Sequence, residues 1–347
     1  MGLFSLTQEL AIDLGTANTL IIYNGKVVVD EPSIVALDVH TGKVVAIGHQ
    51  ARQMHEKTNP NIKTIRPLKD GVIADFNATE LMLRGMIKKV KTSGSLFAPS
   101  LRMVICIPSG STNVEIRAVR DSAEHAGGRE VYMIYEPMAA ALGAGLDVEA
   151  PEGNMVIDIG GGTTNVAMLS LGGIVVSKSL HLGSLDFNAA IKDYLRYQYD
   201  IVTDDTTIEE MKVTNGSAIL PLEDRGYYFM GRGLDDGLQR EMAIKSSELY
   251  HVIGKPLIKI LDLVKDVLRE TPPELAADIM EHGIVLTGGG AKLKGMDQLF
   301  TQELGVPVMV APEPELAVAK GTGIAVADRD KLSALVEGAQ RIYRRRF

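Results

Sequence analysis

The segment Met155-Val-Ile-Asp-Ile-Gly-Gly-Gly-Thr-Thr-Asn-Val-Ala-Met-Leu169 contains two apolar runs on either side of a glycine-rich turn. Two short apolar runs joined in this way predict a β-hairpin, and its first strand ends near Asp158. The chain opens with the same arrangement, because the run Leu10–Asp13 is followed by the turn Leu14–Asn18 and the run Thr19–Tyr23. The repeated hairpin predicts two related domains. Two unrelated glycine turns are the alternative.

Apolar runs bounded by turns alternate with helical patterns along the rest of the chain, which predicts an α/β fold. The first predicted helix has a candidate capping box in Asn77 and Glu80. The longest one ends before Pro272, because a proline ring cannot continue a helix. Residues 200–250 contain several glycine turns and predict a smaller subdomain. Further strands are expected at Lys26–Val29, Ser33–Leu37, Arg102–Ile107 and Gly283–Thr287, and helices at about 77–91, 114–125 and 255–270.

The composition bounds the class of protein. The 347-residue chain is long enough for two domains, and its 46% hydrophobic content excludes wholesale disorder. With 36 basic and 44 acidic side chains, we expect no nucleic acid partner held by bulk charge. The single cysteine, Cys106, excludes an intramolecular disulfide framework, and the histidines lack the spacing of metal ligands. No apolar run approaches the ~20 residues of a membrane span, and no secretion signal opens the sequence, so we expect a cytoplasmic protein.

Both hairpin turns have the composition of phosphate-binding loops. Each carries Asp-x-Gly where a strand ends, at Asp13 and Asp158, and glycine lets backbone N–H groups approach phosphate oxygens. Carboxylates alone would repel phosphate, so the two aspartates make sense with Mg²⁺ between them. A P-loop and a dinucleotide-binding Gly-x-Gly-x-x-Gly are both absent, so hairpins must supply the phosphate contacts. Further donors in the turns are Thr16, Asn18, Thr19, Thr163 and Thr164.

Three other segments are candidates to complete a nucleotide site. Leu286–Lys294 places three glycines between a strand and a helix, where adenine can lie against bare backbone. Glu209 and Lys212 stand at i and i+3 on one helix face, suited to ribose and the purine edge, although an exposed ion pair is the favoured alternative. Glu136 opens a helix of small residues that suits close packing at a hinge. The alternative there is a core helix with an exposed acid at its start.

Five segments of the chain resemble the MreB family, the bacterial actins of the actin, Hsp70 and sugar-kinase superfamily. They are Asp13–Thr19, Arg66–Phe76, Glu136–Ala141, Asp158–Thr164 and Leu286–Ala291, and the resemblance runs in order over nearly the whole chain. It implies two actin-like (ribonuclease H-like) domains with a nucleotide cleft between them, each with a smaller subdomain. Subdomain IA is expected at residues 1–32, 75–144 and 322–347, IB at 33–74, IIA at 145–184 and 252–321, and IIB at 185–251.

The resemblance implies a slow ATPase that uses ATP and Mg²⁺ and forms paired antiparallel protofilaments. Such filaments lie on the inner membrane face and organise cell-wall synthesis that maintains rod shape, with membrane proteins of the MreC, MreD and RodZ kind as partners. Glu136, expected to stay ionised, and Thr164 would orient the attacking water, and Asp13 and Asp158 would hold hydrated Mg²⁺. The implied nucleotide-binding residues are Thr16, Ala17, Asn18, Thr19, Gly160, Gly161, Gly162, Thr163, Glu209, Glu210, Met211, Lys212, Gly288, Gly289, Gly290, Ala291 and Lys292.

The chain departs from the family pattern in and near the expected site. Gly183-Ser184-Leu185 stands where the family usually has Gly-Gly-Asp, and Asp186 comes one place late. Acids are common in the family at three further positions, which here hold Asn165, Tyr135 and Thr214. These changes bear on the hydrolysis rate and on the metal and ribose contacts, and they leave the phosphate loops intact.

A membrane contact without a membrane span is expected from Leu96 and Phe97, two large apolar residues in a predicted loop. By resemblance they enter the bilayer beside anionic lipid headgroups. Each inserted side chain contributes only ~1.5–3 kcal/mol, so a filament binds through many copies. Leu3 and Phe4 are a second candidate contact. A loop folded back on its own core is the alternative for Leu96 and Phe97.

A small-molecule kinase of the same superfamily is the main alternative function. It would need a catalytic aspartate and a substrate pocket facing the γ-phosphate, and the sequence has no further motif for either. A chaperone of the Hsp70 kind would need a peptide-binding domain, for which we expect no room in 347 residues. A division actin such as FtsA usually carries a longer chain with an amphipathic anchor. The choice between ATP and GTP stays open.

Overall fold

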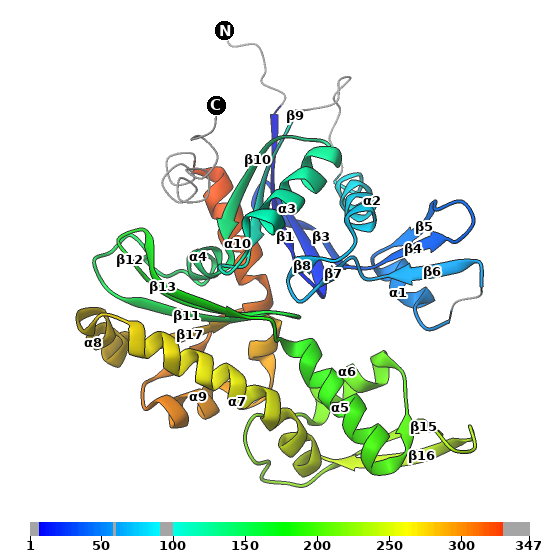
Figure 1. Ribbon diagram of the computed structural model, residues 1–347. Coiled ribbons are helices and arrows are strands. Elements are labelled where there is room, and N and C mark those ends of the chain that lie inside the picture. Colours follow the sequence, from blue (N-terminus) through cyan, green and yellow to red (C-terminus); the bar gives the residue numbers. More distant parts are fainter. Residues whose placement is uncertain (1–6, 58–59, 91–99, 329–347) are drawn as a thin grey trace.

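The computed structural model describes residues 7–57, 60–90 and 100–328. They form two halves, each built on a five-stranded sheet (Figure 1). The first sheet has the strand order β10-β9-β1-β2-β3. Its antiparallel part consists of β1 (Thr7–Leu14), β2 (Asn18–Tyr23) and β3 (Lys26–Pro32). Strands β9 (Ser100–Ile107) and β10 (Gly128–Tyr135) extend the sheet in parallel to β1.

The second sheet repeats this topology, with the strand order β13-β12-β11-β17-β18. Strands β11 (Asn154–Ile159), β12 (Thr164–Ser170) and β13 (Gly173–Leu180) are antiparallel. Strands β17 (Ile284–Thr287) and β18 (Val308–Val310) are parallel to β11. In each sheet, the first two strands along the chain therefore form one of the two predicted hairpins. The prediction of two related domains is confirmed, and the alternative of two unrelated glycine turns is wrong.

Helices pack on each sheet and bury one apolar core per half. In the first half, Met82 and Leu83 of one helix are fully buried against the sheet, and in the second half Phe187 and Phe300 are. Burying such side chains contributes ~1.5–3 kcal/mol each, which stabilises the strands that carry the hairpin turns. The helices of the first half are α2 (Phe76–Ile87) and α3 (Asn113–His125). Those of the second are α5 (Ser184–Tyr199), α7 (Ser246–Glu270), α8 (Pro273–His282) and α9 (Met296–Leu304), with the short helices η1 (Gly289–Lys292) and η2 (Pro314–Leu316).

Helix α2 has its N-cap two residues before the one predicted. Asp75, not Asn77, caps the helix, because the Asp75 carboxylate accepts the backbone N–H of Ala78 (2.9 Å). Asn77 already lies inside the helix, so the predicted capping box is wrong. The helix ends at Ile87.

Helix α7 also begins earlier than expected, at Ser246 and not near Lys255. Its apolar face continues through this first part, where Leu249 and Ile253 are fully buried. The helix also continues through Pro256, although a proline removes one backbone hydrogen bond inside a helix.

A smaller substructure lies beside each sheet, on the same side of the molecule (Figure 1). Both fall within the ranges expected for subdomains IB (33–74) and IIB (185–251), whose exact boundaries stay a prediction. The first comprises β4 (Val35–Asp38), β5 (Val44–Ile47), α1 (His49–Met54), β6 (Ile62–Ile65) and the hairpin of β7 (Leu68–Lys69) and β8 (Val72–Ile73). The second comprises β14 (Ile201–Val202), α6 (Asp205–Asn215), β15 (Gly226–Gly233) and β16 (Gln239–Lys245).

Two helices of small residues, α4 (Glu136–Gly143) and α10 (Ala317–Ala327), lie between the sheets (Figure 1). Their backbones approach so closely that a Cβ on Gly143 would lie 1.8 Å from the Ala317 carbonyl oxygen. Apolar side chains of both sheets surround the two helices in one buried cluster. The expectation of close helix packing between the domains is therefore confirmed.

Candidate functional site

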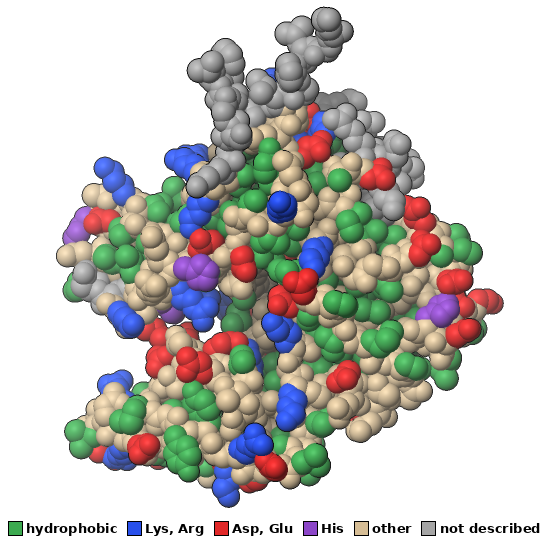
Figure 2. Space-filling view, turned by 180° about the vertical axis from the view of Figure 1, so that it is seen from behind, with side chains coloured by type: hydrophobic (Ala, Val, Ile, Leu, Met, Phe, Trp, Pro, Cys, Tyr) green, Lys and Arg blue, Asp and Glu red, His purple; other side chains and the backbone are tan. Residues whose placement is uncertain are grey.

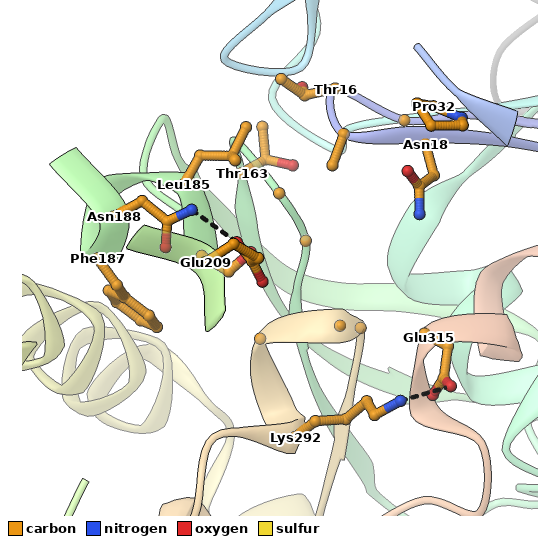
Figure 3. A pocket seen from close by; sticks show the side chains of 18 of the residues that line it. Thr16, Asn18, Pro32, Thr163, Leu185, Phe187, Asn188, Glu209, Lys292 and Glu315 are labelled. Atoms are coloured by element: carbon orange, nitrogen blue, oxygen red, sulfur yellow. Dashed lines mark hydrogen bonds and ion pairs between the residues drawn. The ribbon is translucent and has the colours of Figure 1, made fainter. Parts of the chain in front are cut away.

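A cavity of about 890 Å³ opens between the two halves. Figure 2 shows the hollow from behind, between the upper and lower lobes, and Figure 3 shows the cavity from close by. Its wall comes from both hairpin turns, from the start of α4 and from both small substructures. The predicted nucleotide-binding residues on this wall are Thr16, Ala17, Asn18, Gly160, Gly161, Thr163, Glu209, Lys212, Gly288, Gly289, Gly290 and Lys292.

The two predicted hairpin turns touch each other at this cavity. A Cβ on Gly161 would lie 2.7 Å from the Ala17 Cβ, and one on Gly162 would lie 2.9 Å from the Thr16 hydroxyl oxygen. Only glycine permits such a close approach, so the turns pack with bare backbone against each other. Thr16 and Thr163 both border the cavity beside this contact (Figure 3). One turn from each sheet therefore faces a single shared space.

Three acids gather where the turns meet: Asp158 and Glu136 are buried, and Asp13 is half-buried. Burial raises the pKa of Asp13 to about 6, although the Cys106 thiol donates to Oδ1 (3.2 Å). Burial likewise raises the pKa of Asp158 to about 7, against a hydrogen bond from the Thr287 hydroxyl (2.9 Å). Burial and the charges of Asp158 and Asp13 raise the pKa of Glu136 well above its ordinary value. The expectation of an unshifted pKa for Glu136 is wrong, because the sequence shows neither its burial nor its acidic neighbours.

This set of acids fits Mg²⁺, the ion that the resemblance implies. Carboxylate oxygens are the ligands that Mg²⁺ prefers, and one or two carboxylates with phosphate usually hold it. Among the described residues, no basic side chain lowers the pKa of Asp13, Asp158 or Glu136. A divalent cation between Asp13 and Asp158 would supply the positive charge that these acids lack.

The hairpin of β7 and β8 lies over both turns. The Gly71 N–H donates to the Thr16 hydroxyl oxygen (2.9 Å). Gly71 has φ +78°, and a Cβ there would lie 2.3 Å from Thr163 Cγ2, so only glycine fits. The segment Arg66–Phe76 resembles the family strongly, but the sequence assigned it no role. Its Asp-Gly turn was the available signal, and the structure places that turn against both phosphate loops.

The glycine run after β17 forms another part of the wall. Gly288 has φ +81° and ψ 161°, a conformation that only glycine adopts readily. A Cβ there would lie 2.3 Å from the Ile159 carbonyl oxygen. The next residue, Gly289, differs, because nothing lies within 4 Å of a Cβ built on it. The backbone at Gly289 is therefore open on the wall of the cavity, and the adenine contact there stays a prediction.

Two ion pairs, Lys292 with Glu315 and Lys212 with Glu209, border the same region together with an amide hydrogen bond. Lys292 Nζ lies 2.8 Å from Glu315 Oε1, and Asn188 Nδ2 donates to Glu209 Oε2 (2.6 Å; Figure 3). Lys212 is buried, with Nζ 2.9 Å from Glu209 Oε2. Burial raises the pKa of Glu209, but the Lys212 charge and the Asn188 hydrogen bond outweigh it, so the pKa lies below its ordinary value. The favoured alternative of an exposed pair is wrong, since Glu209 and Lys212 line the cavity.

A polar contact crosses the mouth of the cavity between the two small substructures. Glu56, after α1, accepts the backbone N–H of Asp205 at the start of α6 (3.2 Å to Oε2). His55 Nε2 lies 3.6 Å from the Asp205 carboxylate, and Lys192 Nζ lies 2.8 Å from it. His55, Glu56 and Asp205 offer ligand atoms within 4.8 Å of one another. Sequence spacing could not reveal this group, because Glu56 and Asp205 are 149 residues apart.

Several expected site residues are not among those that line the cavity. Thr164 is fully buried, and its hydroxyl donates to the Leu182 carbonyl (2.8 Å). Thr19 is fully buried too, and Met211 and Ala291 belong to the apolar interior. These four buried residues lie behind the wall, whereas Glu210 is exposed. The full set is Thr19, Gly162, Thr164, Glu210, Met211 and Ala291.

The departure at Leu185 changes the chemistry of one wall. Leu185 lines the cavity beside Phe187 (Figure 3), at the position where the family usually has an aspartate. The neighbouring Asp186 does not replace that acid, because its carboxylate accepts the N–H of Gly183 at the start of α5 (2.7 Å). At this position the wall therefore carries an apolar side chain in place of an acid.

The expected membrane contacts Leu3, Phe4, Leu96 and Phe97 lie outside the described residues. In the part of the chain that the structure describes, no helix combines the length and apolar content needed to cross a bilayer. The membrane contact stays a prediction.

Comparison with known proteins identifies the relatives of this chain. A family model described as MreB/Mbl protein matches residues 7–334. The cell shape-determining protein MreB of Escherichia coli (strain K12) is 48% identical over 330 residues, 94% of each chain. The cell shape-determining protein Mbl of Bacillus subtilis (strain 168) is 44% identical over 326 residues, 94% of this chain and 97% of Mbl.

A solved structure agrees with the sequence relatives. MreB5 of Spiroplasma citri bound to ADP has a TM-score of 0.86 at 37% identity and covers 92% of this chain and 95% of its own. The same protein bound to AMPPNP has a TM-score of 0.87 at 36% identity, over 96% of this chain and 99% of its own. With its two matching halves around one cavity, the chain belongs to the MreB/Mbl family of actin-like proteins.

Proposed function

We propose that this protein binds ATP with Mg²⁺ in the cavity, hydrolyses it slowly and assembles into filaments that determine cell shape. The observation that carries the proposal is the meeting of two glycine turns, each beside an aspartate, at one cavity of about 890 Å³. The Spiroplasma citri relative was solved with ADP and with AMPPNP, which supports nucleotide binding here. The names of the E. coli and B. subtilis relatives support the role in cell shape. Family membership disfavours the small-molecule kinase alternative.

The chemistry divides among the residues that meet at the turns. The backbones of residues 15–18 and 160–163 hold the phosphates. Asp13 and Asp158 would hold Mg²⁺ through water, and the ion would supply the positive charge that phosphoryl transfer requires. Glu136 lines the cavity at the start of α4 and orients the attacking water. Thr164 supports the second turn through Leu182 and takes no direct part.

The nucleoside lies toward the second half. The adenine stacks on the open backbone at Gly289, and Lys292 borders it. Glu209 accepts hydrogen bonds from the ribose hydroxyls, and Lys212 keeps the Glu209 carboxylate charged and in place (2.9 Å). ATP is the nucleotide we propose, because the Spiroplasma citri relative was solved with the adenine nucleotides ADP and AMPPNP.

Filament assembly follows from closure of the two halves around the nucleotide. Closure at α4 and α10 changes the surfaces that successive subunits present, and hydrolysis weakens their contact through the coupling free energy between the sites. We propose paired antiparallel protofilaments on the cytoplasmic face of the inner membrane, held by Leu96 and Phe97 through many weak lipid contacts. Rod-shape and cell-wall synthesis membrane proteins of the MreC, MreD and RodZ kind are the proposed partners.

Sedimentation tests the proposed function. We expect the purified protein to pellet with ATP and Mg²⁺, to stay in solution with EDTA, and to pellet more with anionic lipid vesicles. A variant with Leu96→Ser and Phe97→Ser should still polymerise but no longer bind vesicles, and equal vesicle binding would move the anchor elsewhere, to Leu3 and Phe4. Protein that stays in the supernatant with Mg-ATP and releases no phosphate would contradict the proposal.

Replacing Glu136 with alanine should separate binding from hydrolysis. The variant loses the acceptor that orients water, so we expect phosphate release to slow about 100-fold, with ATP affinity within about twofold of the wild-type value. Single-turnover phosphate release and calorimetry measure the two quantities. Glu209→Ala is the contrasting variant, with weaker ATP binding and nearly unchanged turnover at saturation. A normal turnover rate in Glu136→Ala would remove Glu136 from the mechanism.

Breaking the contact across the cavity mouth should speed nucleotide release. Asp205→Ala removes the partner of His55 and Lys192, and exposed ion pairs contribute up to about 1 kcal/mol, so we expect release to accelerate about three- to fivefold. Stopped-flow chase of a fluorescent ATP analogue measures the rate. Asp235→Ala removes an exposed acid of the same substructure and serves as the control. Equal rates in Asp205→Ala and wild type would show that the contact does not hold the nucleotide in.

A further inference from the structure

Asn165 lies in the middle of the second sheet, next to two residues of the site. In the strand register it pairs with Asp158 on β11 and with Ser179 on β13. Directly paired residues share one face of a sheet, so these three side chains stand in a row. Asn165 is fully buried and is not among the residues that line the cavity. It therefore lies behind the groups that face the nucleotide.

The Asn165 amide holds Glu136 in a defined orientation. Its Nδ2 donates to Glu136 Oε2 at 2.5 Å. Its Oδ1 accepts from the Ser179 hydroxyl (2.6 Å) and from the Ser109 backbone N–H (3.4 Å). A backbone N–H can only donate, so the amide oxygen must face Ser109 and the amide NH₂ must face Glu136. The amide therefore has one orientation and cannot flip without losing these bonds.

Groups from both halves hold this side chain. Ser109 follows β9 of the first sheet, and its hydroxyl lies 2.8 Å from the Ser179 hydroxyl. The Gly110 N–H donates to the same Ser179 oxygen (3.1 Å). Glu136 opens α4 between the sheets, whereas Asn165 and Ser179 belong to the second sheet. The row of hydrogen bonds therefore depends on how the two halves are placed relative to each other.

We propose that Asn165 is the positioning residue for Glu136, an inference that rests on the proposed ATPase function. Its amide binds Oε2 and leaves the other carboxylate oxygen to accept a hydrogen bond from the attacking water. An amide suits this place because it donates to a carboxylate on one side and accepts from a hydroxyl and an N–H on the other. A glutamate, common here in the family, has no donor for Glu136 when ionised. In this chain an amide donor therefore orients Glu136, where the family commonly has a carboxylate.

Steady-state ATP hydrolysis by matched variants tests the proposal. Asn165→Ala should lower kcat about tenfold to a hundredfold, and by clearly more than it weakens ATP affinity, because Asn165 is not among the residues that line the cavity and contacts Asp158 only from behind it. Asn165→Asp keeps the shape but removes the donor, and it should lower kcat as much even if the alanine variant folds poorly. The double variant Asn165→Ala with Glu136→Ala should be no slower than Glu136→Ala alone, since the amide acts through Glu136. Ser170→Ala, a buried serine at the far end of β12, is the control and should keep the wild-type kcat.

Each outcome decides for or against the positioning role. Wild-type kcat in Asn165→Asp, or a double variant slowed by the product of the two single effects, would overturn it. A fall in ATP affinity that matches the fall in kcat would also overturn it, because it would indicate a purely structural role. If the wild-type protein itself did not hydrolyse ATP, the proposed function would be overturned. The hydrolysis rate of the wild type therefore distinguishes failure of the proposed function from failure of the positioning role.

Discussion

Replacing Asp158 with alanine is expected to weaken Mg-ATP binding at least about a hundredfold, the largest effect we predict on the nucleotide. Truncating one partner of a buried charge contact costs ~2–5 kcal/mol, or about 30-fold to several thousand-fold in affinity, and a hundredfold loss lies within this range. Asp158 is buried, and the Thr287 hydroxyl orients its carboxylate (2.9 Å). Isothermal titration calorimetry with Mg-ATP measures the loss.

The metal dependence of this effect provides its control. In EDTA, Asp158→Ala should bind ATP at least as well as the wild type, because a carboxylate no longer faces the phosphates. Asp262→Asn removes an exposed acid of α7 and should bind Mg-ATP like the wild type. Unchanged calorimetric affinity of Asp158→Ala for Mg-ATP would refute the metal role of Asp158.

Replacing Gly288 with alanine is expected to produce the largest loss of stability. An alanine there would carry a Cβ 2.3 Å from the Ile159 carbonyl oxygen at a φ of +81°. Backbone strain in this region costs ~1–3 kcal/mol before the overlap is counted, and folded proteins have only ~5–15 kcal/mol in total. Chemical denaturation measures the loss, which we expect to reach or exceed about 3 kcal/mol.

The neighbouring glycine is the matched control. Nothing lies within 4 Å of a Cβ on Gly289, so Gly289→Ala should change the free energy of unfolding by less than about 0.5 kcal/mol. Its methyl group instead enters the proposed adenine site, so nucleotide affinity should fall while the fold is kept. Equal stability of Gly288→Ala and Gly289→Ala would contradict the geometry of this wall.

The paired sheets could be predicted because their signals are local. At Asp13 and Asp158, an apolar strand, a glycine turn and a second apolar strand follow one another directly in the sequence. Turn chemistry and strand periodicity need no knowledge of distant residues. The same holds for the glycine run at Gly288, whose place between a strand and a helix follows from its neighbours.

The interactions that the sequence missed connect residues far apart in the chain. The contact between Asn165 and Glu136 joins a strand of one sheet to the start of a helix between the sheets. The raised pKa of Glu136 has a similar origin, because burial between the two halves raises it most and the acids Asp158 and Asp13 of the two hairpins raise it further. The motif predicts that Thr164 orients the water, but side chains alternate along a strand, so Thr164 and Asn165 lie on opposite faces and Asn165 is the one that contacts Glu136.

A crystal structure with AMPPNP and Mn²⁺ would test most directly whether one metal–triphosphate lies between the two hairpin turns. Manganese takes the same oxygen ligands as magnesium, and its anomalous scattering locates it. We expect one anomalous peak between the carboxylates of Asp13 and Asp158, with the phosphates against residues 15–18 and 160–163. A peak at His55, Glu56 and Asp205, or a nucleotide bound away from the turns, would contradict it.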